Sequence, residues 1–345
     1  MLNVPGKLSD LSREWLQEAL GVAVQDCRVV DANSGTTGRA VLEIDAPEEA
    51  NLPARLFVKL PPTDEMQRAF VTATGMGKTE AQFYSSLSSE VPVRVPTCYY
   101  AASDEAGESY VMLLEHLEDS GCSFQNASTR YSLDYVRSVL AQFAKLHASY
   151  WQTPRFSADL DWVQPPVRHE IAEHLIEQAL QQHAQTMPPI FREMAELFLG
   201  HTDGFFRIWG EGDHTVIHGD AHDANLFFDN GRPGFLDWAI VSKAPGMRDV
   251  GYFLAGTLTQ EHLPMARGLL GEYRDLLLAQ GVPAPSLDAL WQQFQWHAAY
   301  VWVGATVTLA MGDAWQPVSY VMSALERLHG TLEYIGSAQA IRSAV

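Results

Sequence analysis

The segment VIHGDAHDANLFFDNGRPGFLDW, residues 216–238, places two histidines, four aspartates and two asparagines in 23 positions among apolar residues. Within it, NLFFD and GFLDW resemble two short strands, and the pair Asn230-Gly231 between them is typical of a tight hairpin turn because both residues tolerate positive φ. Such a hairpin brings Asn225, before its first strand, to the same end of the ladder as Asp237. Two oxygen ligands would then converge, which suits Mg²⁺ with water and phosphate oxygens as its other ligands.

Asp220 lies five residues before Asn225, on the loop that leads into the predicted hairpin. The catalytic loop of protein kinases has the same order, with an Asp, an Asn five residues later, and a second Asp that binds metal. This spacing predicts a phosphotransferase that transfers the γ-phosphoryl group of a nucleoside triphosphate to a hydroxyl. Asp220 would act as the base, and Asn225 and Asp237 would bind Mg²⁺.

Two other chemistries compete for the same segment. His218, Asp220 and His222 are spaced as in part of a metallophosphoesterase-type hydrolase, but such enzymes need further ligands upstream and a Gly-Asn-His motif downstream. The chain contains no Gly-Asn-His sequence. A nucleotide-binding pseudokinase would normally lack a base or metal position, and none is missing here. The structural alternative is a loop whose Asp and Asn residues only make turns.

A phosphotransferase also needs a cation on the donor phosphates. Lys59, in RLFVKL, alternates with Val58 and Leu60, so one strand face can be core while the other meets the nucleotide. Glu80, 21 residues later at the start of a predicted helix over 79–87, is the expected ion-pair partner of Lys59. The turn SGTTG, residues 34–38, precedes Lys59 between two predicted strands. It is expected to cover the phosphates with Gly35, Thr36, Thr37 and Gly38, although it is not a GxGxxG loop.

The elements that must position these residues indicate an α+β protein with two lobes. Strand-like runs with alternating apolar residues dominate the first part, whereas helical periodicity dominates from Leu133 onward. We therefore expect an N-terminal lobe with an antiparallel sheet over residues 1–117, carrying the phosphate loop, Lys59 and Glu80. Residues 118–345 should form a mainly helical lobe with the catalytic loop and the acceptor-binding helices.

Composition limits the partners and the compartment. The formal net charge of −19 disfavours nucleic acid and anionic membrane surfaces but is compatible with a metal-nucleotide complex. Three cysteines without a CxxC pair and a start without the pattern of a signal peptide favour the cytoplasm. The longest apolar stretch, residues 298–311, is too short to span a bilayer and is expected to form a buried helix.

The motifs HGDAHDAN, LDW, DVGYFL, VKLPP and EAQFY together resemble the aminoglycoside phosphotransferase and choline kinase superfamily, and most closely its ecdysteroid kinase-like branch. The resemblance implies a protein-kinase-like fold, ATP and Mg²⁺ as cofactors, and a small-molecule hydroxyl substrate. It also implies that adenine binds to backbone groups around Glu115, His116 and Leu117. His218 would brace the catalytic loop, and Asp249 would anchor that loop from the helix that follows.

The acceptor is expected to be a small apolar or choline-like alcohol. Residues 257–345 contain only seven thinly spread Asp and Glu residues, whereas polycationic aminoglycosides would favour clustered carboxylates. Aromatic side chains are more prominent there and directly after Asp237, and these suit an apolar or quaternary-ammonium group. The candidate acceptor-site residues are Trp238, Trp296, Tyr300, Trp302 and Asp313.

Overall fold

The computed structural model describes residues 2–125, 132–313 and 315–345 of the chain. The chain divides into two compact units, one formed by Met1–Phe124 with Phe227–Val241 and the other by Gln125–Leu226 with Ser242–Val345. The boundary expected from the sequence lay after residue 117, with the hairpin in the second lobe. In the structure, the first unit continues to Phe124 and includes most of this hairpin.

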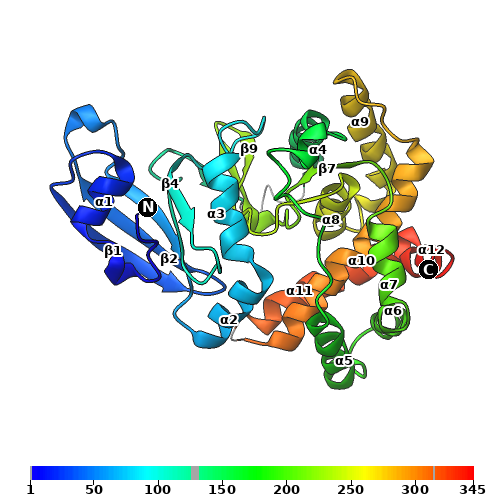
Figure 1. Ribbon diagram of the computed structural model, residues 1–345. Coiled ribbons are helices and arrows are strands. Elements are labelled where there is room, and N and C mark those ends of the chain that lie inside the picture. Colours follow the sequence, from blue (N-terminus) through cyan, green and yellow to red (C-terminus); the bar gives the residue numbers. More distant parts are fainter. Residues whose placement is uncertain (1, 126–131, 314) are drawn as a thin grey trace. The chain divides into compact units, whose positions relative to one another are not determined.

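The first unit is built on a five-stranded antiparallel sheet with the strand order β1-β2-β3-β5-β4 (Figure 1). Its strands are β1 (Asp26–Ser34), β2 (Gly38–Asp45), β3 (Arg55–Leu60), β4 (Cys98–Ser103) and β5 (Tyr110–Glu115). Its helices are α1 (Arg13–Leu20), α2 (Glu65–Thr74) and α3 (Met76–Ser86). Helix α3 begins three residues earlier than the predicted helix, and α2 precedes it.

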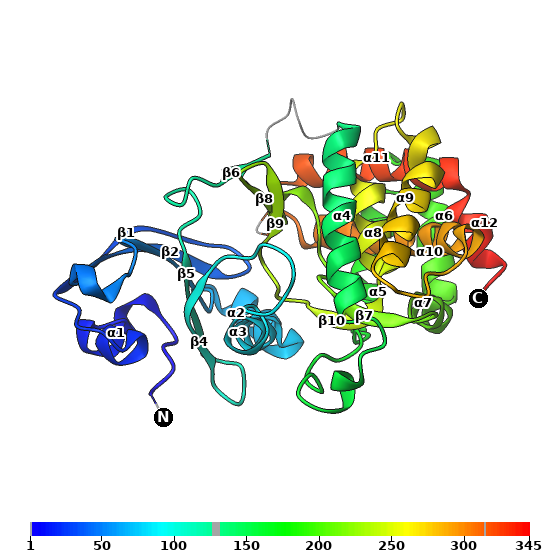
Figure 2. The same cartoon turned by 90° about the horizontal axis from the view of Figure 1, so that it is seen from above.

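The two faces of this sheet are covered by different helices, as Figure 2 shows for α1 and α3. Leu56 and Val58 alternate along β3 and pack into a core that includes Trp15 and Leu16 of α1. Lys59 points to the opposite face, where its ammonium group contacts Glu80 of α3. The alternation in RLFVKL therefore separates an apolar core from a buried charged cluster.

The predicted hairpin is confirmed. Strands β8 (Leu226–Asp229) and β9 (Arg232–Phe235) are joined by Asn230 and Gly231, which both have positive φ, at 51° and 76°. The short strand β6 (Ser123–Phe124) pairs with β8 and completes a three-stranded sheet. The Arg94 side chain donates to the Asp229 carboxylate at 2.7 Å, which ties the hairpin to the rest of the first unit.

The second unit is a helical assembly around α10 (Leu287–Met311), which packs against α5, α8 and α11. Helix α10 contains the predicted buried helix and is apolar on most of its surface, as expected for a helix surrounded by others. The other helices are α4 (Leu133–Ser149), α5 (Ile171–His183), α6 (Pro189–Gly200), α7 (Thr202–Trp209), α8 (Met247–Thr257), α9 (Ala266–Ala279), α11 (Val318–Ile335) and α12 (Ser337–Arg342). Short 3₁₀ turns occur at Leu8–Asp10, Glu48–Ala50, Pro154–Ser157, Asp223–Asn225 and Leu263–Met265.

The strands β7 (His214–Ile217) and β10 (Ser242–Pro245) form a two-stranded ribbon, and the loop with Asp220 and the hairpin lie between them in sequence. Strand β7 leads into the loop that carries Asp220, and β10 leads into α8. Because the two strands are hydrogen-bonded, the loop and the start of α8 are held close together. Across the described ranges, none of the helices has both the length and the apolar character to cross a bilayer.

Candidate active site

Lys59 is the centre of a buried charged cluster in the first unit. Its Nζ lies 2.5 Å from Glu80 Oε2 and 3.1 Å from Asp237 Oδ1. Arg39, which pairs with Lys59 across β2 and β3, places a guanidinium nitrogen 3.9 Å from Asp237 Oδ2. The ion pair between Lys59 and Glu80 that was expected from the sequence is present, and Asp237 joins it.

The cluster shifts the pKa values of its members. Burial opposes the charge on Lys59, but the carboxylates of Asp237 and Glu80 outweigh it and raise the pKa of Lys59 above its usual 10.5. Burial also raises the pKa of Glu80 above its ordinary value, although the Lys59 ammonium group opposes this effect. Lys59 is therefore held as a cation in a site from which water is largely excluded.

Asp237 has a backbone conformation that is uncommon for residues other than glycine. Its φ of 64° lies in the left-handed region, which costs free energy for a residue with a Cβ atom. The residue follows β9 and has its carboxylate on Lys59, so the contact helps to hold the strained backbone. Strain of this kind is often found where a side chain must be aimed at a ligand.

The turn of residues 34–38 joins β1 to β2 at the same end of the sheet as Lys59. Gly35 N donates to Thr37 O at 3.1 Å, which closes the turn. Gly38 pairs with Leu60, and a Cβ atom there would lie 2.8 Å from Pro61 O, so only glycine fits this close approach. This location is compatible with a loop that covers phosphates.

The segment Glu115 to Leu117 follows β5 and is partly occupied by internal contacts. The Glu115 carboxylate accepts from Arg94 Nη2 at 2.6 Å and from Thr97 N at 2.9 Å, and these bonds hold the pKa of Glu115 below its usual 4.5 although burial opposes them. The carbonyl oxygens of His116 and Leu117 accept bonds from the following turn. The N–H groups of His116 and Leu117 make no backbone hydrogen bond within the described chain.

In the second unit, Asp220 and Asn225 are brought together by the loop and the 3₁₀ turn Asp223–Asn225. Asn225 Nδ2 donates to Asp220 O at 2.9 Å and to Asp220 Oδ2 at 3.2 Å. The amide nitrogen is thus engaged, which leaves the amide oxygen as the atom of this side chain that could bind a ligand. His218 Nδ1 accepts from Asp220 N at 3.2 Å, so this buried imidazole braces the loop.

Asp249 on α8 fixes the start of the same loop. Its two carboxylate oxygens accept from the backbone N–H groups of His218 and Gly219, each at 2.8 Å. His147 Nε2 lies 3.2 Å from Asp249 Oδ2, and His147 Nδ1 lies 2.8 Å from Tyr273 Oη. All of these side chains are buried, so the loop is attached to α8 and α4 by bonds that water does not weaken.

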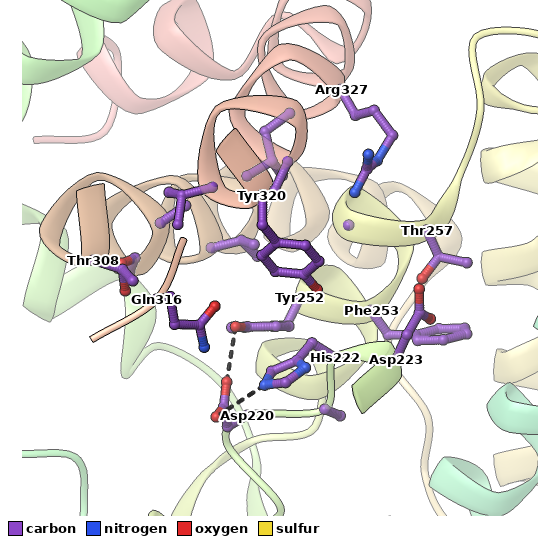
Figure 3. Close-up of a pocket in the computed structure, with 18 residues that line it drawn as sticks. Asp220, His222, Asp223, Tyr252, Phe253, Thr257, Thr308, Gln316, Tyr320 and Arg327 are labelled. Carbon is purple, nitrogen blue, oxygen red and sulfur yellow. Dashed lines mark hydrogen bonds and ion pairs between the residues drawn. The ribbon is translucent and has the colours of Figure 1, made fainter. Parts of the chain in front are cut away.

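Asp220 lines a cavity of about 190 Å³ within the second unit, shown in Figure 3. The Tyr252 hydroxyl donates to Asp220 Oδ1 at 2.8 Å, and burial together with this carboxylate raises the pKa of Tyr252 well above 10. His222 Nε2 lies 3.6 Å from Asp220 Oδ2. Sequence reasoning missed Tyr252, although its position three residues after Asp249 puts both side chains on one face of α8.

The aromatic residues expected at the acceptor site make packing contacts of their own, and their role in acceptor binding stays a prediction; Tyr300 Oη donates to Gly219 O at 3.5 Å, next to Asp220. Trp296 and Trp302 are buried in α10, where Trp302 Nε1 donates to His329 Nε2 at 3.2 Å. Tyr300 stacks on the Arg248 guanidinium at 3.8 Å. None of these three aromatic side chains lines the cavity that contains Asp220.

Two further acceptor-site candidates also have local packing roles. Trp238 is fully buried in the first unit and stacks on Phe83 with 4.1 Å between ring centroids. Asp313 accepts from Val318 N at 2.8 Å and so caps the start of α11. Asp313 is not among the residues that line the cavity around Asp220.

The hydrolase alternative finds little support in the geometry. His218 Nδ1 accepts from Asp220 N, and His222 Nδ1 accepts from Ala224 N at 3.2 Å. Each histidine therefore uses one ring nitrogen to hold the loop backbone. Within residues 2–125, 132–313 and 315–345, no group of three or more His, Cys, Asp or Glu side chains is arranged to hold a metal.

Comparison with known proteins gives one family and a set of related folds. The model of a family described as the Phosphotransferase enzyme family, abbreviated APH, matches residues 32–276. This match covers more than half of the chain and includes Lys59, Glu80 and the whole of residues 216–238. No curated protein sequence matches the chain.

Solved structures of low sequence identity share the fold over nearly the whole chain. A Ralstonia eutropha protein solved as a candidate aminoglycoside phosphotransferase is 15% identical, with a TM-score of 0.55 over 96% of this chain and 98% of that one. The aminoglycoside phosphotransferase APH(2")-IIIa with GDP and kanamycin is 13% identical (TM-score 0.54), and the choline kinase LicA from Streptococcus pneumoniae is also 13% identical (TM-score 0.53). Each covers 93% of this chain and 98% of its own. The predicted kinase-like α+β fold is confirmed.

Proposed function

Because the chain belongs to the Phosphotransferase enzyme family, we propose that it transfers the γ-phosphoryl group of ATP to a hydroxyl group of a small molecule. Family membership confirms the resemblance to the aminoglycoside phosphotransferase and choline kinase superfamily, while the ecdysteroid kinase-like branch stays a prediction. The observation that carries the proposal is the position of Asp220, whose carboxylate lines a cavity and is held by Tyr252 and Asn225.

Asp220 is the proposed base. A hydroxyl that enters the cavity could donate to its carboxylate, which would orient the oxygen for attack and accept its proton as the transition state forms. The bonds from Tyr252 and Asn225 fix the carboxylate before the acceptor arrives, so little ordering is needed at the moment of reaction. No covalent intermediate on the protein is required.

Lys59 is the proposed contact for the donor phosphates. Its ammonium group is buried, positively charged and held by Glu80, which suits a fixed point charge for a triphosphate. The turn with Gly35, Thr36, Thr37 and Gly38 is proposed to cover those phosphates. The N–H groups of His116 and Leu117 are proposed to bind the base of the nucleotide.

Asn225 and Asp237 are the proposed Mg²⁺ ligands. Carboxylate and amide oxygens are the ligand types that Mg²⁺ prefers, and the hydrogen bonds from the Asn225 side chain to Asp220 use its amide nitrogen rather than its oxygen. The ion would supply charge neutralisation of the phosphate oxygens when bound. The left-handed backbone of Asp237 is consistent with a side chain that must be aimed at a ligand.

The acceptor is proposed to be a hydroxyl compound with an apolar body. The cavity wall between its polar groups is aliphatic and includes Val301, Ala305 and Val321. Such a wall favours an apolar alcohol over a polyamino sugar. A choline-like acceptor would bring its quaternary ammonium group toward Arg327, which also lines the cavity and carries the same charge.

A binding experiment with Asp237→Ala tests this function. Wild-type protein should be stabilised by Mg·ATP, by about 2.7 kcal/mol at a ligand concentration near 100 times Kd, and the variant should lose this stabilisation. Thermal shift with Mg·ATP, Mg·GTP and each nucleotide without Mg²⁺ measures the effect and the base preference. An equal shift in wild type and variant would show that Asp237 is not part of the metal-nucleotide site.

A further inference from the structure

The cavity around Asp220 has two polar ends and an apolar middle. Asp220, His222 and Tyr252 form one end, and Figure 3 draws Arg327 of α11 on the other side of the labelled residues from Asp220. Asp223, Phe253 and Thr308 also line the cavity, and the remaining residues come mainly from α8, α10 and α11 and are small or aliphatic: Gly256, Val301, Gly304, Ala305, Val321, Ala324 and Leu328. A ligand that fills this space must therefore be polar at both ends.

Arg327 has no partner for its charge. Its Nη1 donates only to Ser323 O of its own helix, at 3.1 Å, and its Nε is buried without any hydrogen-bond partner. Within the described chain, no carboxylate lies within 4.0 Å of its guanidinium nitrogens. Most other described arginines are ion-paired, namely Arg13, Arg28, Arg39, Arg55, Arg94, Arg137, Arg155, Arg168, Arg192, Arg207, Arg267, Arg274 and Arg342.

The missing partner is notable because the chain has 42 acidic residues and only 23 basic ones. A half-buried guanidinium loses part of its hydration, and a carboxylate or phosphate restores it through two parallel N–H···O bonds. The protein supplies no such group beside Arg327, although acids are in excess. An anionic group on the ligand would complete the site.

Nearby polar groups suit the same ligand. Thr257 and Tyr320 also line the cavity, and their hydroxyl groups can donate to an oxyanion, whereas Figure 3 draws Gln316 on the side of Asp220. The net charge of −19 opposes an anion at long range, but salt screens such repulsion beyond about 8 Å at physiological ionic strength. Two acids, Asp220 and Asp223, line the same cavity, so an oxyanion is accommodated only at the end of the cavity that holds Arg327.

We propose that the acceptor is a hydroxyl compound with an anionic group at its far end, a carboxylate or a phosphate monoester, and that Arg327 binds this group. The inference rests on the proposed function only in assigning the hydroxyl end to Asp220. An acceptor of this kind places its hydroxyl at Asp220 and its oxyanion at Arg327, with an apolar chain along the aliphatic wall. Polyamino sugars and choline-like alcohols would place a positively charged ammonium group against the positively charged guanidinium of Arg327.

A series of straight-chain ω-hydroxycarboxylates tests the proposal against two matched series of equal length, the primary amides and the ω-amino alcohols. Straight-chain ω-hydroxyalkyl phosphates form a fourth arm that separates phosphate from carboxylate recognition. Binding to the nucleotide-free protein is measured by calorimetry, and phosphoryl transfer from Mg·ATP gives KM and kcat. The variants are Arg327→Gln and Arg327→Lys, with Arg192→Gln as the control because Arg192 is exposed on α6 and does not line this cavity.

We expect the best anion of the panel to bind the wild type about 10- to 100-fold more tightly than the matching amide, because the amide carries no negative charge to pair with Arg327. Arg327→Gln should abolish this preference, Arg327→Lys should retain part of it, and Arg192→Gln should retain all of it. Equal binding of anion and amide by wild type, or an anion preference that survives in Arg327→Gln, would overturn the proposal. If anions bind through Arg327 but no hydroxyl compound is phosphorylated, the anion site stands and the proposed phosphotransfer fails.

Discussion

Asp249→Asn is expected to loosen the catalytic loop without removing any residue that would contact substrate. The carboxylate accepts from the N–H groups of both His218 and Gly219 at 2.8 Å, in a buried setting. An amide at this position has one oxygen to accept a bond, and its NH₂ group would face the second N–H. At least one charge-assisted bond, of about 1.5–3 kcal/mol, is therefore lost.

Hydrogen exchange at these two amides measures the loss directly. A change of about 1.5–3 kcal/mol corresponds to exchange roughly 10- to 150-fold faster for at least one of the two N–H groups. Asp203→Asn is the control, because Asp203 is an exposed carboxylate of the same unit that only pairs with Arg168. Unchanged protection of both amides in Asp249→Asn would refute the claim that Asp249 anchors the loop.

Two further substitutions test buried charges elsewhere in the chain. Glu80→Gln leaves Asp237 as the only carboxylate that pairs with Lys59, and it should lower the free energy of unfolding, measured in urea, by about 1.5–3 kcal/mol. Glu14→Gln changes an exposed ion pair and should not alter this free energy measurably. Equal urea midpoints for the two variants would contradict the prediction. Burial lowers the pKa of His329 from its usual 6.5 to about 4, so its neutral form contributes stability that is complete above 6.5 and is lost as the pH falls toward 4. When the pH falls from about 7.5 to 5, the free energy of unfolding of the wild type should decrease by about 2 kcal/mol more than that of His329→Gln. The Gln side chain keeps an acceptor for Trp302 but does not titrate. If the free energy of unfolding depended on pH in the same way in both proteins, this role of His329 would be excluded.

Much of the candidate site follows from local sequence. Asp220 and Asn225 are five residues apart on one short loop, so their contact depends on few backbone angles. Lys59 and Glu80 are further apart, but the alternation of β3 and the helical period of α3 leave few alternatives for their side chains. The Asn230-Gly231 turn fixes the hairpin because positive φ at both residues suits few other sequences.

The acceptor region could not be predicted in the same way. Helix α10 is apolar on most sides, so its sequence gives no sign of which aromatic residues line a cavity and which fill the core. Trp296 and Trp302 are in the core, whereas the cavity wall comes from small residues such as Gly304 and Ala305. Arg327 stands out only once its surroundings are known, because the absence of a partner is a property of three-dimensional packing.

The central claim is that Asp220 prepares a hydroxyl group for phosphoryl transfer, and the most direct test is transfer of labelled γ-phosphate from Mg·ATP to hydroxyl acceptors by wild type and Asp220→Asn. The amide keeps the size and most hydrogen bonds of the carboxylate but cannot take the proton. Turnover should fall by roughly 10² to 10⁴, while the affinity for Mg·ATP is retained. Turnover in Asp220→Asn equal to that of wild type would contradict the account and move the base to another residue.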